Sequence, residues 1–163
     1  MYSEVKHFEK FEFGDFVYLM LRKIPPEKRD DLCDKIIEKQ PCKTELISID
    51  VIDNFLRQED SVFILQFYKG KECGISIITI ITQNNYRNKI YIERFCTSLE
   101  CEEKKLKCGQ NLMNFIKHYY CSKKKCSIEL NSVPSATGFY EKMLFKRARS
   151  DILNNYLYVN WID

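Results

Sequence analysis

Two β-rich runs separated by a short turn constrain the fold of this chain most strongly. Residues 62–68 and 75–82 are rich in branched and aromatic side chains, and the segment between them contains Lys69, Gly70, Lys71 and Glu72. Runs of this kind pair as a β-hairpin. A polar turn at residues 84–89 leads to a third β-rich run at residues 90–99. The sequence therefore predicts three consecutive strands that form a meander.

Helices are predicted on both sides of this meander. Residues 27–40 follow Pro25 and Pro26 and place Leu32, Ile36 and Ile37 on one face, which is typical of an amphipathic helix. The same spacing predicts a short helix at residues 50–60 and a long one at residues 106–120. A final helix is predicted at residues 136–144, with Ser135 as its N-cap.

The remaining segments read as strands, except for one that stays open. Alternation or β-rich composition predicts strands at residues 5–13, 127–133, 145–149 and 155–161. Residues 16–24 fit either a helix or a strand, because their hydrophobic period does not decide between the two. The order of elements indicates an α+β fold on a mixed sheet.

Length and composition favour one globular domain. The chain has 163 residues, of which 45% are hydrophobic and 30% charged, so it can bury a core, and we expect residues 1–163 to form a single domain. The longest apolar run, residues 16–21, is far shorter than the ~20 residues that span a bilayer. The first ten residues lack the apolar core of a secretory signal. We therefore expect a cytoplasmic protein, with the nucleus as an alternative, and no membrane partner.

The eight cysteines, at positions 33, 42, 73, 96, 101, 108, 121 and 126, contain no C-x-x-C pair. Structural zinc sites usually draw their four ligands from such short-spaced pairs, so we expect no metal site. A disulfide framework is typical of short secreted chains. The sequence favours free thiols that serve as small hydrophobic side chains in a reducing compartment.

The two parts of the chain differ in charge. Residues 1–60 hold ten Lys and Arg against fourteen Asp and Glu, and the remainder holds sixteen against nine. A basic C-terminal part suggests an anionic ligand, although a solvated basic surface explains the charge alone better. Three consecutive lysines at positions 123–125 are too short a run, without interleaved aromatics, to indicate nucleic-acid binding, and we expect no nucleic-acid partner.

A polar, lysine-rich segment precedes the long helix and is the best candidate for anion binding. It reads KKLKCGQ from Lys104 to Gln110. A helix N-terminus leaves backbone N–H groups unpaired and carries partial positive charge, so lysines beside it would favour a phosphate. Gly109 would allow the backbone to approach such an anion closely.

This segment resembles the pyrophosphate loop of the GNAT superfamily, the acetyl-CoA-dependent N-acetyltransferases, whose motif is Gln/Arg-x-x-Gly-x-Gly/Ala. The segment ATGFYEKMLF at residues 136–145 resembles the second signature of the family. The likeness is strongest from Tyr91 to Phe145 and is nearest to the branch that acetylates histones and other protein lysines. The sequence departs from the motifs at Lys104, Lys107, Val133 and Leu144; Lys107 and Leu144 stand where the family has glycine.

The resemblance implies a mostly antiparallel sheet flanked by helices, and it implies a site. Glu93, on the strand before the loop, matches the general base of the histone-acetyltransferase branch, and Tyr140 matches the general acid. The alternatives are a surface glutamate paired with Lys89 or Arg94 and a tyrosine that only packs its helix. The residues that the resemblance assigns to acetyl-CoA are Thr97, Ser98, Leu99, Lys104, Lys105, Leu106, Lys107, Cys108, Gly109, Gln110, Ala136 and Phe139.

Two functions follow as hypotheses. The first is direct acetyl transfer from acetyl-CoA to a primary amine, with a protein lysine, a peptide or a polyamine as the acceptor. A covalent route through Cys96 or Cys108 is a minor variant, because a nucleophilic thiol needs a lowered pKa. The second is a degenerate module that binds CoA or a protein partner without turnover, which Lys107 and Leu144 favour. The acceptor would meet residues 16–40 and 150–155, and the acidic N-terminal part would suit a cation.

Overall fold

The structure is a computed structural model that describes residues 8–42, 47–150 and 156–162. The chain forms two compact units. The first contains the described residues up to Ile78 together with Arg94–Leu112, and the second contains Thr79–Glu93 and the residues from Met113 onward. Three elements run through both units: β4 (Lys71–Gln83), β5 (Arg87–Thr97) and α4 (Cys108–Cys121).

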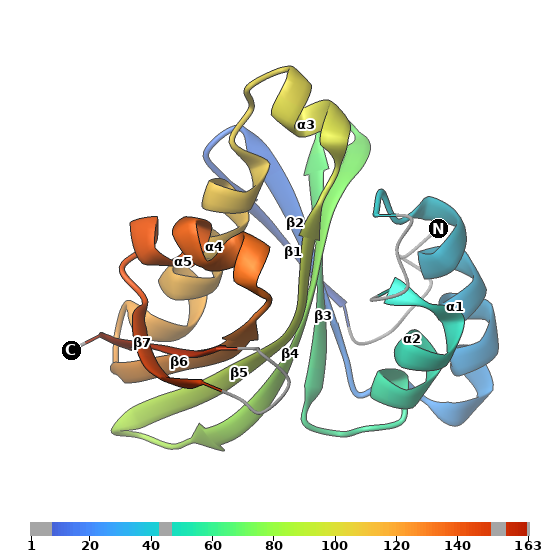
Figure 1. Cartoon of the computed structure of the whole chain (residues 1–163). Helices are drawn as coiled ribbons and strands as arrows, with labels where there is room; N and C mark the ends of the chain where they lie inside the picture. The colour runs from blue at the N-terminus through green and yellow to red at the C-terminus, as the bar shows by residue number, and fades with distance from the viewer. Residues whose placement is uncertain (1–7, 43–46, 151–155, 163) are drawn as a thin grey trace. The chain divides into compact units, whose positions relative to one another are not determined.

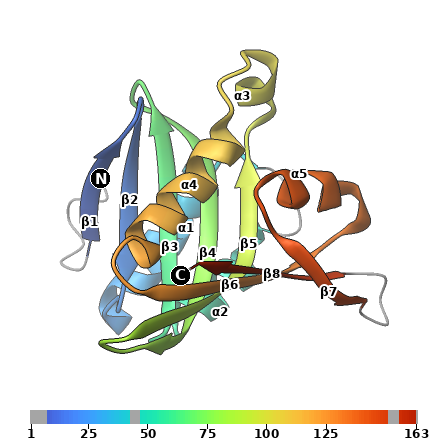
Figure 2. The same cartoon turned by 90° about the vertical axis from the view of Figure 1, so that its left-hand side faces the viewer.

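The first unit begins with neighbouring strands in chain order, as Figure 2 shows for β1, β2 and β3. Strand β1 (Phe8–Phe13) pairs antiparallel with β2 (Phe16–Arg22), which pairs antiparallel with β3 (Ser61–Tyr68). The turn from β3 into β4 has positive φ at both Lys69 (50°) and Gly70 (80°), which is the backbone of a type I′ hairpin turn. The predicted hairpin is confirmed. Of residues 16–24, which the sequence left open, Phe16–Arg22 form β2.

Helices α1 (Pro26–Lys39) and α2 (Ile49–Leu56) cover one face of these strands (Figure 1). Pro26 opens α1, because a proline at the first helical position lacks only an N–H that would be unpaired there. Ser48 caps α2 by accepting a hydrogen bond from the Val51 N–H. The buried core of this unit joins the two helices to the strands; it includes Leu21, Leu32, Cys33, Ile36, Ile52, Phe55, Phe63, Leu65, Ile75 and Ile77.

The second unit contains the only parallel strand pair among those with a described register. Strand β6 (Lys125–Ser132) runs parallel to β5, with Ile90 opposite Ile128, and α4 supplies the crossover that a parallel pair needs. Strand β8 (Tyr156–Ile162) pairs antiparallel with β6 and with β7 (Lys146–Ser150). Between β6 and β7 lie the 3₁₀ turn η3 (Pro134–Ala136) and α5 (Thr137–Lys142). The fold is α+β, with a mixed, mostly antiparallel sheet flanked by helices, as predicted.

Three local predictions need correction. The N-cap of α5 is Ala136, which makes no side-chain cap, so the prediction of Ser135 was wrong; the 3₁₀ turn that begins at Pro134 displaces the start of the helix. The long helix begins at Cys108 instead of residue 106. A short helix that the sequence did not indicate, α3 (Leu99–Glu103), follows β5. Residues 151–155, part of the expected acceptor region, lie outside the described residues.

The prediction that all cysteines are free thiols was wrong. The structure contains the disulfides Cys42–Cys96, Cys101–Cys108 and Cys121–Cys126. Only Cys33 and Cys73 are free thiols, and both are buried. Spacing alone could not show these pairs, because two of them join residues from different secondary-structure elements across a turn and the third spans 54 residues of sequence.

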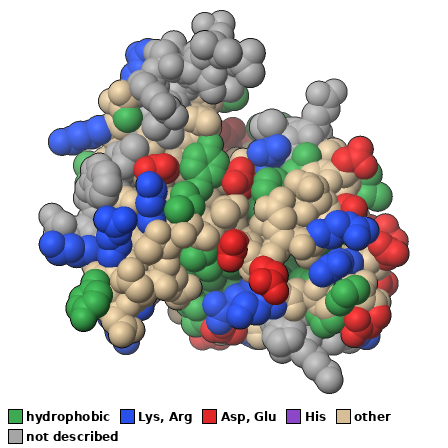
Figure 3. Space-filling model, turned by 90° about the horizontal axis from the view of Figure 1, so that it is seen from below, with side chains coloured by type: hydrophobic (Ala, Val, Ile, Leu, Met, Phe, Trp, Pro, Cys, Tyr) green, Lys and Arg blue, Asp and Glu red, His purple; other side chains and the backbone are tan. Residues whose placement is uncertain are grey.

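The surface mixes both charges on the face drawn in Figure 3, where Lys and Arg side chains lie beside Asp and Glu side chains and do not form a field of one sign. Within the described ranges, every helix is too short or too polar to cross a membrane.

Candidate functional site

A pocket of about 390 Å³ lies in the first unit, where the β3–β4 turn faces α3 and the loop after it. Ser98, Lys104 and Leu106, three of the residues that the resemblance assigned to the cofactor, line this pocket. The hairpin contributes a second set of lining residues that sequence reasoning missed. These are Tyr68, Lys69, Lys71, Glu72 and Cys73. No motif marked them, because they come from a turn that precedes the recognised loop by some thirty positions.

A charge network crosses this pocket. The Glu100 carboxylate accepts hydrogen bonds from Lys104 Nζ (2.8 Å) and from Lys71 Nζ. These two lysines lower the pKa of Glu100 to about 2, and Glu100 in turn raises the pKa of Lys104. Two of the three lysines that line the pocket are therefore ion-paired within the protein, so Glu100 partly offsets their charge toward an anion.

Left-handed backbone shapes the loop between α3 and α4. Lys105 has φ 55°, and around it the Leu106 N–H donates to Cys101 O while the Lys105 N–H donates to Glu102 O. This pair of bonds is a Schellman motif, which ends α3 and explains the conformation of Lys105. Lys107 also has φ 55°, directly before α4 begins. Both lysine side chains are exposed.

The start of α4 is fixed by a buried glutamine. Gln66, on β3, is fully buried and donates from Nε2 to Cys108 O (2.9 Å) and to the Tyr18 hydroxyl (3.1 Å). A Cβ at Gly74 would lie well inside van der Waals contact of Gln66 Oε1, so glycine at that position leaves the room that Gln66 needs. The first turn of α4 contains no acidic residue. Its N-terminus therefore keeps the partial positive charge of a helix start.

The strand end that the resemblance assigned to acetyl-CoA, residues 97–99, is partly used within the protein. The Ser98 N–H donates to Cys73 O (2.9 Å), and Ser98 Oγ caps α3 by accepting from the Cys101 N–H (3.2 Å). This backbone donor is consequently not available to a thioester carbonyl. Thr97 ends β5, and Leu99 begins α3 with 75% of its surface exposed.

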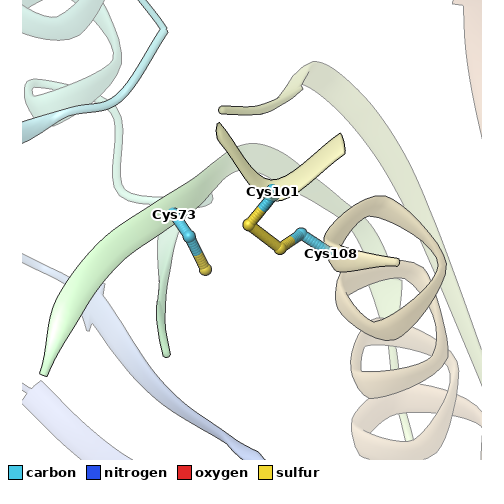
Figure 4. A group of neighbouring side chains, drawn as sticks. All are labelled: Cys73, Cys101 and Cys108. Carbon is cyan, nitrogen blue, oxygen red and sulfur yellow. A yellow bond between two sulfur atoms is a disulfide. The ribbon is translucent and has the colours of Figure 1, made fainter. Parts of the chain in front are cut away.

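Three buried cysteines meet beside this loop. The Sγ atoms of Cys73, Cys101 and Cys108 all lie within 4.8 Å of one another (Figure 4). Cys101 and Cys108 form a disulfide, and the Cys73 thiol lies beside it. Burial raises the pKa of Cys73 to about 12. Sequence spacing missed the group, because one member is on β4 and the other two enclose the loop.

Glu93 is in the second unit, on β5. Its side chain is half-buried, and its Oε1 atom accepts a hydrogen bond from Thr79 Oγ1 (2.9 Å) on β4. Lys89, one of the partners considered for a purely surface glutamate, instead pairs with Glu129 at 3.3 Å.

Tyr140, the candidate acid, lies on α5 in the same unit and is 8% exposed. Its ring contacts Phe139 (5.2 Å between centroids), Phe145 (5.9 Å) and Tyr158 (6.3 Å). Burial raises the pKa of Tyr140 to about 12, which keeps the hydroxyl protonated at neutral pH. Ala136 and Phe139, the other cofactor candidates of this unit, precede Tyr140 in η3 and α5.

Comparison with protein families gives the family. A family model described as "Acetyltransferase (GNAT) domain" matches residues 29–159, well over half of the chain. The chain belongs to the GNAT acetyltransferase family. A search of curated protein sequences finds no match.

Solved GNAT structures share the fold. Tetrahymena Gcn5 aligns with a TM-score of 0.62 and 11% identity over 88% of this chain and 94% of its own. An aminoglycoside N(6′)-acetyltransferase from Legionella pneumophila aligns with a TM-score of 0.61 and 15% identity over 93% of this chain and 94% of its own. Arabidopsis thaliana Naa50, solved with a bisubstrate CoA–peptide analogue, aligns with a TM-score of 0.57 and 15% identity over 88% of this chain and 97% of its own. At these identities the likeness concerns the fold.

Both glycine positions of the GNAT motifs have left-handed backbone in this chain. Lys107 has φ 55° and Leu144 has φ 71°. Leu144 follows α5 in a second Schellman motif, in which the Phe145 N–H donates to Tyr140 O and the Leu144 N–H donates to Glu141 O. Whether the Lys107 position needs positive φ is a question that the sequence alone does not answer, and the structure gives it left-handed backbone. Both positions therefore have left-handed backbone without glycine, the residue that adopts it most easily.

Proposed function

We propose that this GNAT protein is an acetyl-CoA-dependent N-acetyltransferase that acts on a primary amine. The observation that carries the proposal is the exposed, lysine-bearing segment that enters the N-terminus of α4, in a chain that matches the GNAT family. A helix start with nearby lysines suits the pyrophosphate of CoA, and Lys105 and Lys107 are the exposed cations that would face it. Acetyl-CoA would supply an activated thioester.

Glu93 is proposed to take the proton from the acceptor. A lysine-like amine has a pKa near 10.4 and is mostly protonated at neutral pH, so it must lose a proton before it attacks. Glu93 is a half-buried carboxylate whose Oε1 atom accepts a hydrogen bond from the Thr79 hydroxyl, which helps to orient it. Such a base contributes about 10²–10⁴-fold to the rate.

Tyr140 is proposed to return a proton to the departing thiolate. Its hydroxyl is protonated at neutral pH, as a general acid requires, although burial also makes it a weaker acid than a free tyrosine. The covalent variant through Cys96 or Cys108 is contradicted by the structure, in which both sulfurs are in disulfides and neither is a thiol. Direct attack by the amine remains as the proposed route.

A cationic acceptor is favoured by the acidic N-terminal part of the chain, which includes α1. This helix carries Glu27, Asp30, Asp31, Asp34 and Glu38, against Lys28, Arg29, Lys35 and Lys39, and Lys35 pairs with Asp31 at 3.2 Å. A protein lysine, a peptide or a polyamine fits this chemistry. The fold itself does not choose among them, since its structural relatives include enzymes named for different acceptors.

The test is a CoA-release assay with acetyl-CoA and a panel of a lysine peptide, spermidine and an aminoglycoside. Turnover on any of them is expected, and Glu93→Gln should lower kcat about 10²-fold or more. Glu129→Gln is the matched control, because Glu129 is a half-buried carboxylate on the neighbouring strand and pairs with Lys89. Equal rates for the two variants would remove Glu93 from the mechanism.

Tyr140→Phe is tested in the same way, with Tyr120→Phe as the control, since Tyr120 is another buried tyrosine of the second unit. Only Tyr140→Phe should lower kcat while acetyl-CoA affinity stays within a few fold. A Tyr140→Phe enzyme with wild-type kcat would leave Tyr140 as a packing residue alone.

A non-catalytic module that binds CoA or a protein partner is the second candidate. Lys107 and Leu144 favour it, because both hold strained backbone at GNAT glycine positions. Isothermal titration with acetyl-CoA separates the candidates. Binding without CoA release across the amine panel supports the module, whereas no binding at high micromolar acetyl-CoA contradicts both CoA-dependent functions.

A further inference from the structure

Three cysteine side chains of the first unit converge without any role in the proposed acetyl transfer. Cys73, Cys101 and Cys108 are 5%, 3% and 2% exposed and come from β4, α3 and α4. Their Sγ atoms lie within 4.8 Å of one another (Figure 4). A single disulfide uses only two of the three sulfurs, so the Cys73 thiol is left beside it.

We propose that Cys73, Cys101 and Cys108 form, in the reduced protein, a binding site for a soft metal ion. Thiolate ligands select ions such as Cu(I), Zn(II) and Cd(II) over hard, oxygen-preferring ions. A zinc–sulfur bond is about 2.3 Å long, which places the sulfurs of one ion roughly 3.8–4.0 Å apart. The three sulfurs are already grouped on this scale, and opening the disulfide requires only that two of the side chains separate.

The backbone at each cysteine is held by bonds that do not involve the disulfide. Cys73 O accepts from the Ser98 N–H (2.9 Å), the Cys101 N–H donates to the capping Ser98 Oγ (3.2 Å), and Cys108 O accepts from Gln66 Nε2 (2.9 Å). Reduction therefore leaves the three side chains anchored on the same supports. Ligands that are fixed by surrounding hydrogen bonds are what a protein metal site needs.

The site would have an open coordination position. In the part of the chain that the structure describes, no fourth Cys, His, Asp or Glu joins the group. Cys73 and Cys101 line the pocket of about 390 Å³, so an ion held by the three sulfurs would be reached from that pocket by water or by an external thiol. Three protein ligands with an open fourth position are typical of reactive zinc sites rather than of closed structural ones.

Opening the disulfide and binding the metal ion require one co-reactant, a small-molecule thiol. Two thiols of a small-molecule reductant cleave the Cys101–Cys108 disulfide and leave as its own disulfide, which yields two cysteine thiols. The metal ion then displaces protons from the three thiols and forms three metal–sulfur bonds without changing its oxidation state. The site takes no part in the chemical steps of the proposed acetyl transfer and forms whether or not the protein is an enzyme, although Cys108 begins the helix that is proposed to meet CoA.

The experiment uses the full chain, reduced and then freed of reductant by anaerobic desalting. Cd²⁺ is titrated in, and its binding is followed by thiolate-to-metal charge-transfer absorption. X-ray absorption at one equivalent should show three sulfur neighbours. Cys73→Ser should weaken the tightest site at least about 100-fold, since loss of a direct ligand exceeds the 10–100-fold cost of losing its outer partners.

Cys33→Ser is the matched control, because Cys33 is the other buried free thiol of the first unit and lies on α1. It should leave the Cd²⁺ affinity unchanged. Cys108→Ser, which removes a different ligand, should repeat the loss and guards against a folding defect peculiar to Cys73→Ser. Equal affinities of the Cys73 and Cys33 variants, or a Cys101–Cys108 disulfide that cannot be reduced in the folded chain, would overturn the proposal.

Discussion

The backbone at Leu144 allows a direct test of the strain described above. Leu144 has φ 71°, is 75% exposed and is the left-handed residue of the Schellman motif that ends α5. A left-handed conformation costs a non-glycine residue roughly 1–2 kcal/mol. Glycine removes this cost but adds about 0.5–1 kcal/mol of backbone entropy in the unfolded chain. We expect Leu144→Gly to be about 1 kcal/mol more stable than Leu144→Ala.

The comparison with alanine isolates the backbone contribution, because both variants lose the same largely exposed leucine side chain. The free energies of unfolding are measured by urea denaturation and by heating, followed by circular dichroism. For a chain of this length, about 1 kcal/mol corresponds to a Tm difference of roughly 2–4 °C. If Leu144→Gly unfolds at the same point as Leu144→Ala or earlier, Leu144 is not strained and the argument about the GNAT glycine positions fails.

Three further predictions concern residues of the first unit. Lys107→Gly should raise the Tm while Lys107→Ala does not, since Lys107 also has positive φ. Gly74→Ala should destabilise by about 1–3 kcal/mol because its Cβ meets the buried Gln66; Gly138→Ala, which meets nothing within 4 Å, is the control. Hydrogen bonds from two lysines lower the pKa of Glu100 to about 2, so its stabilisation is present above about pH 4.5 and lost as the pH falls toward 2; Glu100→Gln and wild type should therefore differ in Tm at pH 7 and converge near pH 2.

The secondary structure was largely predictable because local patterns determine it. The β3–β4 hairpin follows from two β-rich runs around Gly70, and α1 follows from a proline start and one apolar face. Residues 16–24 could not be assigned from the sequence. A largely buried strand and a buried helix share the same apolar composition, so composition does not separate them. Helix α3 was missed because its five residues are too few to show a period.

The candidate site was predictable only where a contiguous motif marks it. The segment from Lys104 to Gln110 and the one around Tyr140 could be recognised, because each is local in sequence. The Lys71–Glu100 ion pair and the contact of Gln66 with Cys108 could not, since both depend on how β3 and β4 pack against residues some thirty to forty positions later. The disulfide pairing of the cysteines could not be predicted for the same reason.

The loop between α3 and α4 brings these features into one energetic argument. It contains two lysines, Lys105 and Lys107, with φ 55°, which together cost roughly 2–4 kcal/mol. The Cys101–Cys108 disulfide encloses both of them, and closing a loop of this size stabilises the folded chain by about 2–3 kcal/mol in the chain-entropy view. The two quantities are comparable, so reduction without a replacement should loosen the segment that is proposed to meet the pyrophosphate of CoA.

A metal ion on the three sulfurs would close the same loop again. The state of these cysteines is therefore expected to set the affinity for acetyl-CoA, in the order disulfide or metal-bound above reduced and metal-free. Titration of acetyl-CoA against the three forms measures that order, and equal affinities in all three would show that the loop is held by Gln66 and the Schellman bonds alone.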